Sequence, residues 1–153
     1  MTKVWFVRHG ESISNANLPT ETPEGSELTP KGEQEAELAA TFFTEAPDLI
    51  VTSSYKRAQQ KAEPTINRFP IVPVETWPVH EFTYLAPIRY KGTIGDERWE
   101  FAKEYWQRCD PQEKEMGTGE SFAELLGRVD ALVQRLRSLS PHTAAEHSEL
   151  RHF

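Results

Sequence analysis

Residues 4–11 read Val-Trp-Phe-Val-Arg-His-Gly-Glu, a short apolar run that ends in an arginine, a histidine and a glycine. The β-branched and aromatic side chains at 3–7 predict a buried strand. Two similar runs follow at 49–52 and 71–76, and Pro73 places the last of them at a sheet edge. Helical patterns separate these runs. The alternation predicts an α/β fold, a three-layer α/β/α sandwich whose mostly parallel central sheet carries helices on both faces.

Helical periodicity and capping signals predict four helices. The first begins at Thr29-Pro30, an N-cap residue followed by a proline at the first helical position. The second begins near Tyr55, and we expect Pro64 to kink or end it. The third spans 96–108. A capping box opens the fourth, a strongly amphipathic helix over 121–139.

Length and composition indicate one domain over residues 1–153, with a lid or insert at 84–118 and an atypical tail at 140–153. Cys109 is the single cysteine, which excludes an internal disulfide. The formal net charge of −7 argues against nucleic acid as a partner, and no apolar run has the length of a membrane span. We expect a cytoplasmic protein that acts on a small molecule.

The tripeptide Arg8-His9-Gly10 follows the first predicted strand. In α/β sheets, ligand-binding and catalytic residues commonly lie at the carboxyl ends of the strands. An imidazole nitrogen is a competent nucleophile toward phosphorus, and an arginine offers planar charged donors to phosphate oxygens. Glycine lets the backbone approach a substrate closely. The alternative is a structural histidine with a solvated arginine, and the tripeptide alone does not decide between the two.

Three further side chains favour the phosphoryl-transfer interpretation. Asn15 follows shortly and offers an amide donor to the same phosphate. Arg57 lies just beyond the second predicted strand and would clamp the phosphoryl group opposite Arg8. Glu81 follows the third strand, and its carboxyl would act as a general acid on the leaving oxygen.

In combination these residues resemble the histidine phosphatase superfamily, which contains phosphoglycerate mutases and many phosphomonoesterases. The matching motifs are Phe6-Val7-Arg8-His9-Gly10-Glu11 with Asn15, Leu28-Thr29-Pro30-Lys31-Gly32, Ser53 with Arg57-Ala58, Glu81, and Gly119-Glu120-Ser121 with Arg128. The resemblance implies His9 as the phosphorylated nucleophile. It implies Arg8 and Arg57 as phosphate clamps, Asn15 as a further phosphate contact and Glu81 as the proton donor. It implies no metal and no other cofactor.

The end of the chain departs from this pattern. Family members follow the long helix with an apolar strand that ends in a second His-Gly, whereas residues 140–153 contain neither. His142, His147 and His152 follow no predicted strand, so we favour a solvated tail. The resemblance implies that the missing strand would separate 4–7 from 49–52. We therefore expect a truncated or frameshifted family member. Its two strands would pair directly, be bridged in an exchanged or edge-paired homodimer, or leave exposed edges.

The leading functional prediction is a phosphomonoester hydrolase that acts through a phosphohistidine on a small phosphorylated metabolite, with an activity that loss of the second histidine would weaken. One alternative is a phosphoglycerate mutase, which shares every quoted motif. Another is a phosphate-binding protein with little turnover. In the expected lid, Tyr84, Arg89, Tyr90 and Lys91 are basic and aromatic enough to touch a substrate, although a solvated loop is the interpretation we favour for them.

Overall fold

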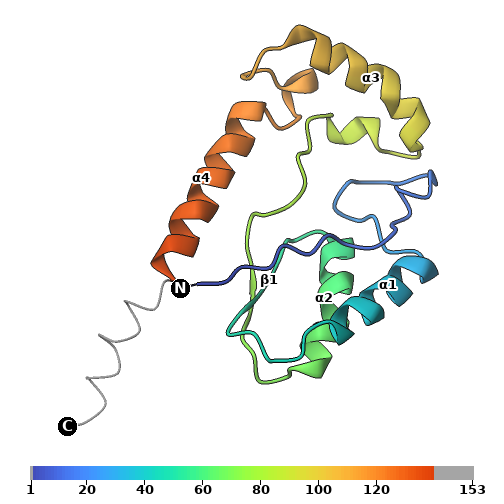
Figure 1. The fold of residues 1–153 in the computed structure, drawn as a ribbon. Coiled ribbons are helices and arrows are strands. Elements are labelled where there is room, and N and C mark those ends of the chain that lie inside the picture. Colours follow the sequence, from blue (N-terminus) through green and yellow to red (C-terminus); the bar gives the residue numbers. More distant parts are fainter. Residues whose placement is uncertain (1, 140–153) are drawn as a thin grey trace.

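The computed structural model describes residues 2–139, and it has the expected alternation of strands and helices (Figure 1). The elements in chain order are α1 (Pro30–Thr41), β1 (Ile50–Thr52), α2 (Lys56–Arg68), β2 (Val74–Thr76), α3 (Gly95–Arg108) and α4 (Phe122–Ser138). Two short 3-10 turns, Pro87–Arg89 and Glu115–Gly117, lie on either side of α3. The α/β class is therefore confirmed.

The sheet within residues 2–139 consists of two parallel strands joined through α2. Ile50 of β1 pairs with Val74 of β2, and the register continues to Thr52 and Thr76. Beyond the strand, the N–H of Trp77 donates to the carbonyl of Thr52 at 2.9 Å. Both strands therefore end at the same edge, and the segments that follow them leave the sheet side by side.

Local capping and packing explain the first two helices. The side chain of Thr29 accepts a hydrogen bond from the N–H of Gly32 and Pro30 occupies the first turn, as the sequence predicts. Helix α2 packs against both α1 and β1, and it continues past Pro64 to Arg68. The helix therefore does not end at Pro64, and the kink that was the other expectation there stays a prediction.

The predicted strand at 3–7 is wrong. Residues 2–10 run as irregular chain, because no described segment offers them a hydrogen-bonding partner and β1 pairs only with β2. The apolar side chains that a sheet would bury are exposed, at 42% for Val4, 52% for Trp5, 80% for Phe6 and 52% for Val7. Trp5 still packs edge-on against Phe42, with ring centroids 5.6 Å apart.

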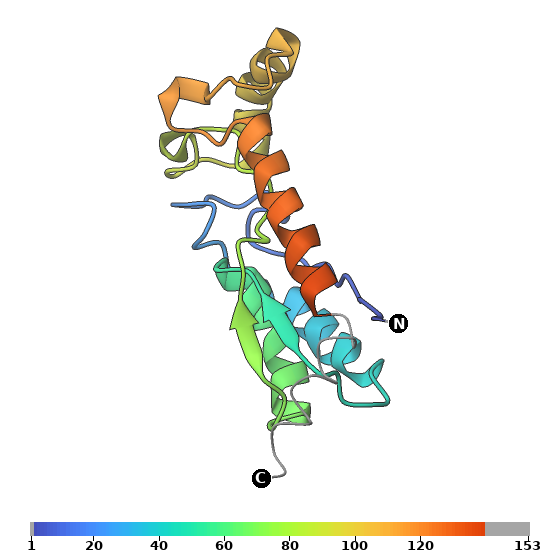
Figure 2. The ribbon, with the colours of Figure 1, turned by 90° about the vertical axis from the view of Figure 1, so that its left-hand side faces the viewer.

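Helix α4 lies on the side of the sheet opposite α1 and α2 (Figures 1 and 2). The expected capping box is present, since Ser121 and Glu124 exchange backbone–side-chain hydrogen bonds. Arg135 holds the helix to the sheet by donating to Glu75 at 2.6 Å and by lying 4.1 Å above the ring centroid of Trp77. No residue of α4 is buried, and Leu126 and Val129 on its apolar face are 49% and 43% exposed. None of the helices within residues 2–139 is both long and apolar enough to cross a membrane.

The exposed apolar side chains of residues 4–7 and of α4 predict self-association, in line with the expected homodimer. Light scattering after gel filtration of the full chain should give a mass above that of one chain, falling on dilution. Replacing Phe6 and Leu126 with serine should move the mass toward one chain, since both side chains are exposed. Glu100→Ser on the outer surface of α3 is the control. A single-chain mass at every concentration contradicts the prediction.

Candidate active site

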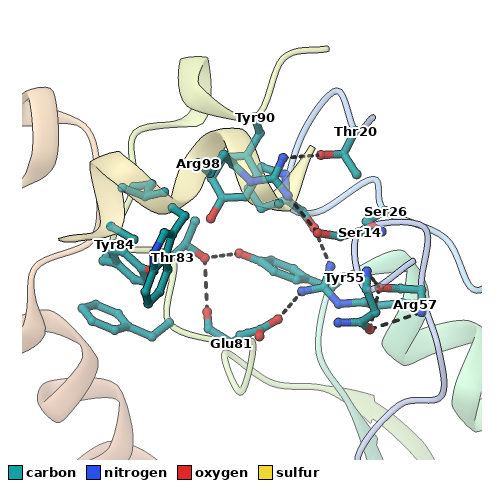
Figure 3. A pocket seen from close by; sticks show the side chains of 18 residues that line it. Ser14, Thr20, Ser26, Tyr55, Arg57, Glu81, Thr83, Tyr84, Tyr90 and Arg98 are labelled. Carbon is teal, nitrogen blue, oxygen red and sulfur yellow. Dashed lines mark hydrogen bonds and ion pairs between the residues drawn. The ribbon is translucent and has the colours of Figure 1, made fainter. Parts of the chain in front are cut away.

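A cavity of about 220 Å³ opens beyond the carboxyl ends of β1 and β2. Its walls come from the loop after residue 11, the start of α2, the segment after β2 and the first half of α3 (Figure 3). Three residues expected at the site line it, namely Asn15, Arg57 and Glu81. The topology thus brings together side chains that lie far apart in the sequence.

The imidazole of His9 is held in one tautomer. Its Nδ1 lies 2.7 Å from the carbonyl oxygen of Gly10. A carbonyl oxygen only accepts, so Nδ1 carries the proton and Nε2 is left with a free lone pair. That lone pair accepts a hydrogen bond from Nε of Arg57 at 3.1 Å. The ring therefore presents a nucleophilic nitrogen to a cation.

The side chain of Arg57 contacts three separate segments of the chain. It is 6% exposed and lies in the first turn of α2, so its position is fixed by the helix. Besides the bond to His9, Nη1 donates to the carbonyl of Pro23 at 2.6 Å and Nη2 donates to Oε2 of Glu81 at 2.6 Å. One guanidinium thus joins the candidate nucleophile to the candidate acid, and Figure 3 shows its contact with Glu81.

Glu81 sits on the irregular segment that follows β2, and an ion pair steadies that segment. Arg128 of α4 donates to both carboxylate oxygens of Glu120, at 2.6 and 2.9 Å. The same guanidinium donates to the carbonyls of Pro78 at 2.8 Å and His80 at 3.2 Å. Burial opposes the charge of Glu120, but hydrogen bonds from Arg128 and from the N–H of Thr83 outweigh it and hold the pKa below its usual range. The ion pair between Arg128 and Glu120 therefore holds in place the segment that carries Glu81, the candidate acid.

Asn15 lines the cavity, and its amide oxygen is bonded to Ser12. Its Oδ1 accepts from the N–H of Ser12 at 3.2 Å and from the hydroxyl of Ser12 at 2.8 Å. Because Oδ1 takes both donors, the Nδ2 group is the part of the amide left to face the cavity. The expected role of Asn15 as an amide donor to phosphate stays a prediction.

Arg8 is placed differently from the other candidates. Its side chain is exposed, it does not line the cavity, and it makes no hydrogen bond or ion pair with residues 2–139. His9 does not line the cavity either, but it is joined to the cluster by the hydrogen bond from Arg57. The expected clamp by Arg8 stays a prediction. His142, His147 and His152 lie outside the described part of the chain, so the predicted solvated tail stays a prediction.

Close packing fixes the turn that carries the nucleophile. A Cβ added to Gly10 would lie 2.7 Å from the carbonyl oxygen of Gly32 and 2.7 Å from Oε2 of Glu35. The N–H of Glu11 donates to the same Glu35 oxygen at 2.9 Å. Hydrogen bonds from Lys31 and Thr29 lower the pKa of Glu11. Glycine is therefore required at position 10 by the approach of α1.

The lid segment contributes more to the cavity than the sequence indicated. Tyr84 and Tyr90 line it, so the interpretation of a solvated loop is wrong for both. Arg89 instead pairs with the buried Glu115 at 3.0 Å. Burial raises the pKa of Tyr90 to about 12, so its hydroxyl stays protonated at neutral pH.

Two buried cavity residues were missed from the sequence. Tyr55 stacks on the ring of His80 with centroids 5.0 Å apart, and burial raises the pKa of its hydroxyl. Burial, followed by the charge of Arg128, lowers the pKa of His80. Arg98 reaches the cavity from α3. The sequence placed Arg98 on the predicted helix at 96–108, but no motif in that helix marked it as a site residue. Among residues 2–139 no group of three or more metal-ligating side chains is placed to hold an ion.

The chain is similar to proteins that act on phosphate esters, in sequence and in structure. A family model described as histidine phosphatase superfamily (branch 1) matches residues 4–146. A 2,3-bisphosphoglycerate-dependent phosphoglycerate mutase from Thermobifida fusca is 26% identical over an alignment 166 residues long. The alignment covers 93% of this chain and 66% of the mutase.

Two solved structures are similar at 26% identity. The α-ribazole phosphatase from Shigella flexneri superposes with a TM-score of 0.66, covering 86% of this chain and 65% of that one. A mycobacterial glucosyl-3-phosphoglycerate phosphatase, solved with VO3, gives a TM-score of 0.65, with 87% and 66% covered. This chain therefore spans just under two thirds of the length of these relatives.

The packing around Gly10 predicts an asymmetric effect of two glycine substitutions. Gly10→Ala should lower the free energy of unfolding by about 1–3 kcal/mol, because its Cβ would collide with backbone. Gly127→Ala in α4 is the matched control, since no atom lies within 4 Å of its Cβ. It should raise the free energy of unfolding by about 0.5–1 kcal/mol through helix propensity. Urea unfolding measures both, and equal effects of the two variants would contradict the packing argument.

Proposed function

Because the chain belongs to the histidine phosphatase superfamily, we propose that it hydrolyses small phosphomonoesters through a phosphohistidine at His9. The observation that carries the proposal is the guanidinium of Arg57. It contacts Nε2 of His9 through one nitrogen and the carboxylate of Glu81 through another. A nucleophile, a phosphate-binding cation and an acid are thus held within one hydrogen-bonded cluster at a cavity.

The first half of the proposed reaction transfers the phosphoryl group to the protein. Nε2 of His9 attacks phosphorus with its free lone pair, and the bond from phosphorus to the ester oxygen breaks. A protonated Glu81 gives its proton to that oxygen, so the alcohol leaves uncharged. Arg57 would exchange its contacts with His9 and Glu81 for phosphoryl oxygens, whose charge it stabilises through the transition state. Asn15 would donate to the same group from its Nδ2.

The second half returns the protein to its starting state. A water molecule occupies the place of the departed alcohol, and ionised Glu81 takes a proton from it. The oxygen attacks phosphorus and the bond from phosphorus to Nε2 breaks, releasing inorganic phosphate. Glu81 ends protonated and His9 ends neutral, ready for another ester. The hydrogen bond from Nδ1 to the Gly10 carbonyl keeps the ring oriented through both steps.

The likeness to a phosphoglycerate mutase supports a second candidate function. A mutase would use the same first step and then pass the phosphoryl group to a second hydroxyl group in place of water. The two activities differ in the acceptor. Transfer to added glycerate or glycerol at a rate above that of water would favour the mutase reading.

The placement of Arg8 supports a third candidate, phosphate binding with little turnover. Its side chain is exposed and does not line the cavity, so the cluster holds one charged clamp where two were expected. Losing a preorganised charge-stabilising group typically costs about a hundredfold or more in rate. Phosphate binding by the full chain without measurable hydrolysis would favour this reading.

The nucleophile is tested by His9→Ala. Hydrolysis of 4-nitrophenyl phosphate should fall by about three orders of magnitude or more, because the covalent route is lost. A chain with alanine at positions 142, 147 and 152 is the matched control, and it should keep its rate if those histidines take no part. Unchanged turnover in His9→Ala would show that the nucleophile assignment is wrong.

The acid is tested by the leaving-group dependence of Glu81→Gln. For an alkyl phosphate, kcat/KM should fall by about a hundredfold or more, because the alkoxide needs a proton. For 4-nitrophenyl phosphate the fall should be under about tenfold, since that leaving group is stable without a proton. The parameter kcat/KM reports the steps up to the phosphorylated protein. Equal losses on both esters would contradict the role of Glu81.

A further inference from the structure

Arg98 is a buried cation at the end of the cavity away from His9. It extends from α3, is 6% exposed and lines the cavity together with Tyr90. Figure 3 shows Arg98 and Tyr90 at one end of the cavity and Arg57 and Glu81 at the other, with Tyr55 and Thr83 between them. Two guanidinium groups therefore border one small volume.

The hydrogen bonds of Arg98 all go to neutral oxygens. Nη1 donates to the carbonyl of Thr93 at 2.7 Å and to its hydroxyl at 3.0 Å, with Thr20 Oγ1 at 3.4 Å. Nη2 donates to the hydroxyl of Ser14 at 3.0 Å. The ring of Tyr90 lies 4.8 Å from the guanidinium carbon. These contacts orient the cation and leave its charge without a counter-ion.

The other arginines of residues 2–139 that are buried or half-buried each form an ion pair with a glutamate. Arg57 pairs with Glu81, Arg89 with Glu115, and Arg128 with Glu120. No carboxylate within residues 2–139 forms an ion pair with Arg98. Burial lowers its pKa, as expected for a charge held away from water without an anion.

The cavity as a whole has an excess of positive charge. Among its lining residues, Arg57 and Arg98 are cationic and Glu81 is the one carboxylate, and Glu81 already contacts Arg57. Tyr90 cannot supply a negative charge near neutral pH, because burial raises its pKa to about 12. A buried charge that lacks a partner is costly, and a bound anion relieves that cost. The positive charge in the cavity that lacks a carboxylate partner is therefore that of Arg98.

We infer that Arg98 is a specificity residue that binds a second anionic group of the substrate, so that the preferred substrates are small phosphomonoesters carrying a carboxylate or a second phosphoryl group. This inference rests on the proposed phosphatase function. The phosphoryl group that reacts lies at Arg57 and His9, and the second anion lies against Arg98 beside the Ser14 hydroxyl. The cavity volume of about 220 Å³ limits the part between the two anions to a few atoms.

The test compares matched substrates on the full chain. Each ω-carboxyalkyl phosphate of two to six carbons is compared with the alkyl phosphate of equal length, and alkanediol bisphosphates form a third series. At one length, the second anion should raise kcat/KM by about tenfold or more, mainly through KM, as expected of a charge-assisted contact. The series that gains most distinguishes a carboxylate from a phosphoryl group. No gain at any length in either series overturns the inference.

Variants of Arg98 then assign the preference. Arg98→Met should remove the advantage of the second anion, measured within the variant as the ratio of kcat/KM for the ω-carboxyalkyl phosphate to kcat/KM for the alkyl phosphate of equal length. Arg98→Lys should keep part of that ratio because the charge remains. Thermal unfolding checks that both variants fold. If Arg98→Met does not fold, the wild-type series and Arg98→Lys still decide. An advantage that persists undiminished in a folded Arg98→Met would place the second anion elsewhere.

Binding of alkylphosphonates separates this inference from the catalytic proposal, because these analogues are not hydrolysed. Calorimetry should show ω-carboxyalkylphosphonates binding about tenfold or more tightly than alkylphosphonates of equal length, and Arg98→Met should remove the difference. Such a difference without turnover of any ester would uphold the Arg98 site and refute the phosphatase. Equal binding of the two series, or no binding by either, would overturn the Arg98 site.

Discussion

The hydrogen bonds of one buried guanidinium organise this site. Arg57 donates to Nε2 of His9, to the carbonyl of Pro23 and to the carboxylate of Glu81, and so joins three segments that the sheet only brings near one another. Each of its three nitrogens has a different partner, a task that the planar fork of arginine performs and the point charge of lysine does not. Its position depends in turn on β1, which starts α2 at the sheet edge.

A second group of contacts holds the lid over the cavity. Arg98 joins α3 to the loop that carries Ser14 and Thr20, and Asn17 donates to Asp96 at 2.8 Å on the same boundary. Arg128 performs a similar task for the segment around Glu81. Loops with little regular structure are thus fixed by arginine side chains bonded to backbone and hydroxyl oxygens. The geometry of the site depends on these polar contacts more than on the small sheet.

The sequence predicted the parts of the fold that local chemistry decides. The capped starts of α1 and α4 and the runs at β1 and β2 were readable because caps and apolar periodicity act within a few residues. The irregular course of residues 3–7 could not be predicted in this way. A strand forms only beside a paired neighbour, and apolar character alone does not supply one. The passage of α2 through Pro64 likewise depends on packing that no local pattern contains.

The same distinction applies to the site. Arg57, Glu81 and Asn15 were found because each follows a strand or lies in the motif around His9, and the structure brings all three to one cavity. Arg98 was missed because its importance comes from burial without a carboxylate partner, which is a property of the folded chain. The exposed position of Arg8 was also unpredictable, since it depends on the unpaired course of residues 2–10.

The proposed chemistry depends on one tautomer of His9, in which the Nε2 lone pair faces Arg57 and the Nδ1 proton is held by the Gly10 carbonyl. Nitrogen-15 NMR of the histidine-labelled full chain tests it most directly, at a pH where the imidazole is neutral, with His9→Ala identifying the signal. The account predicts that the His9 ring is protonated at Nδ1 and unprotonated at Nε2. Replacing Arg57 with glutamine should shift the Nε2 resonance. A ring protonated at Nε2, or an Nε2 signal insensitive to Arg57, would contradict the account.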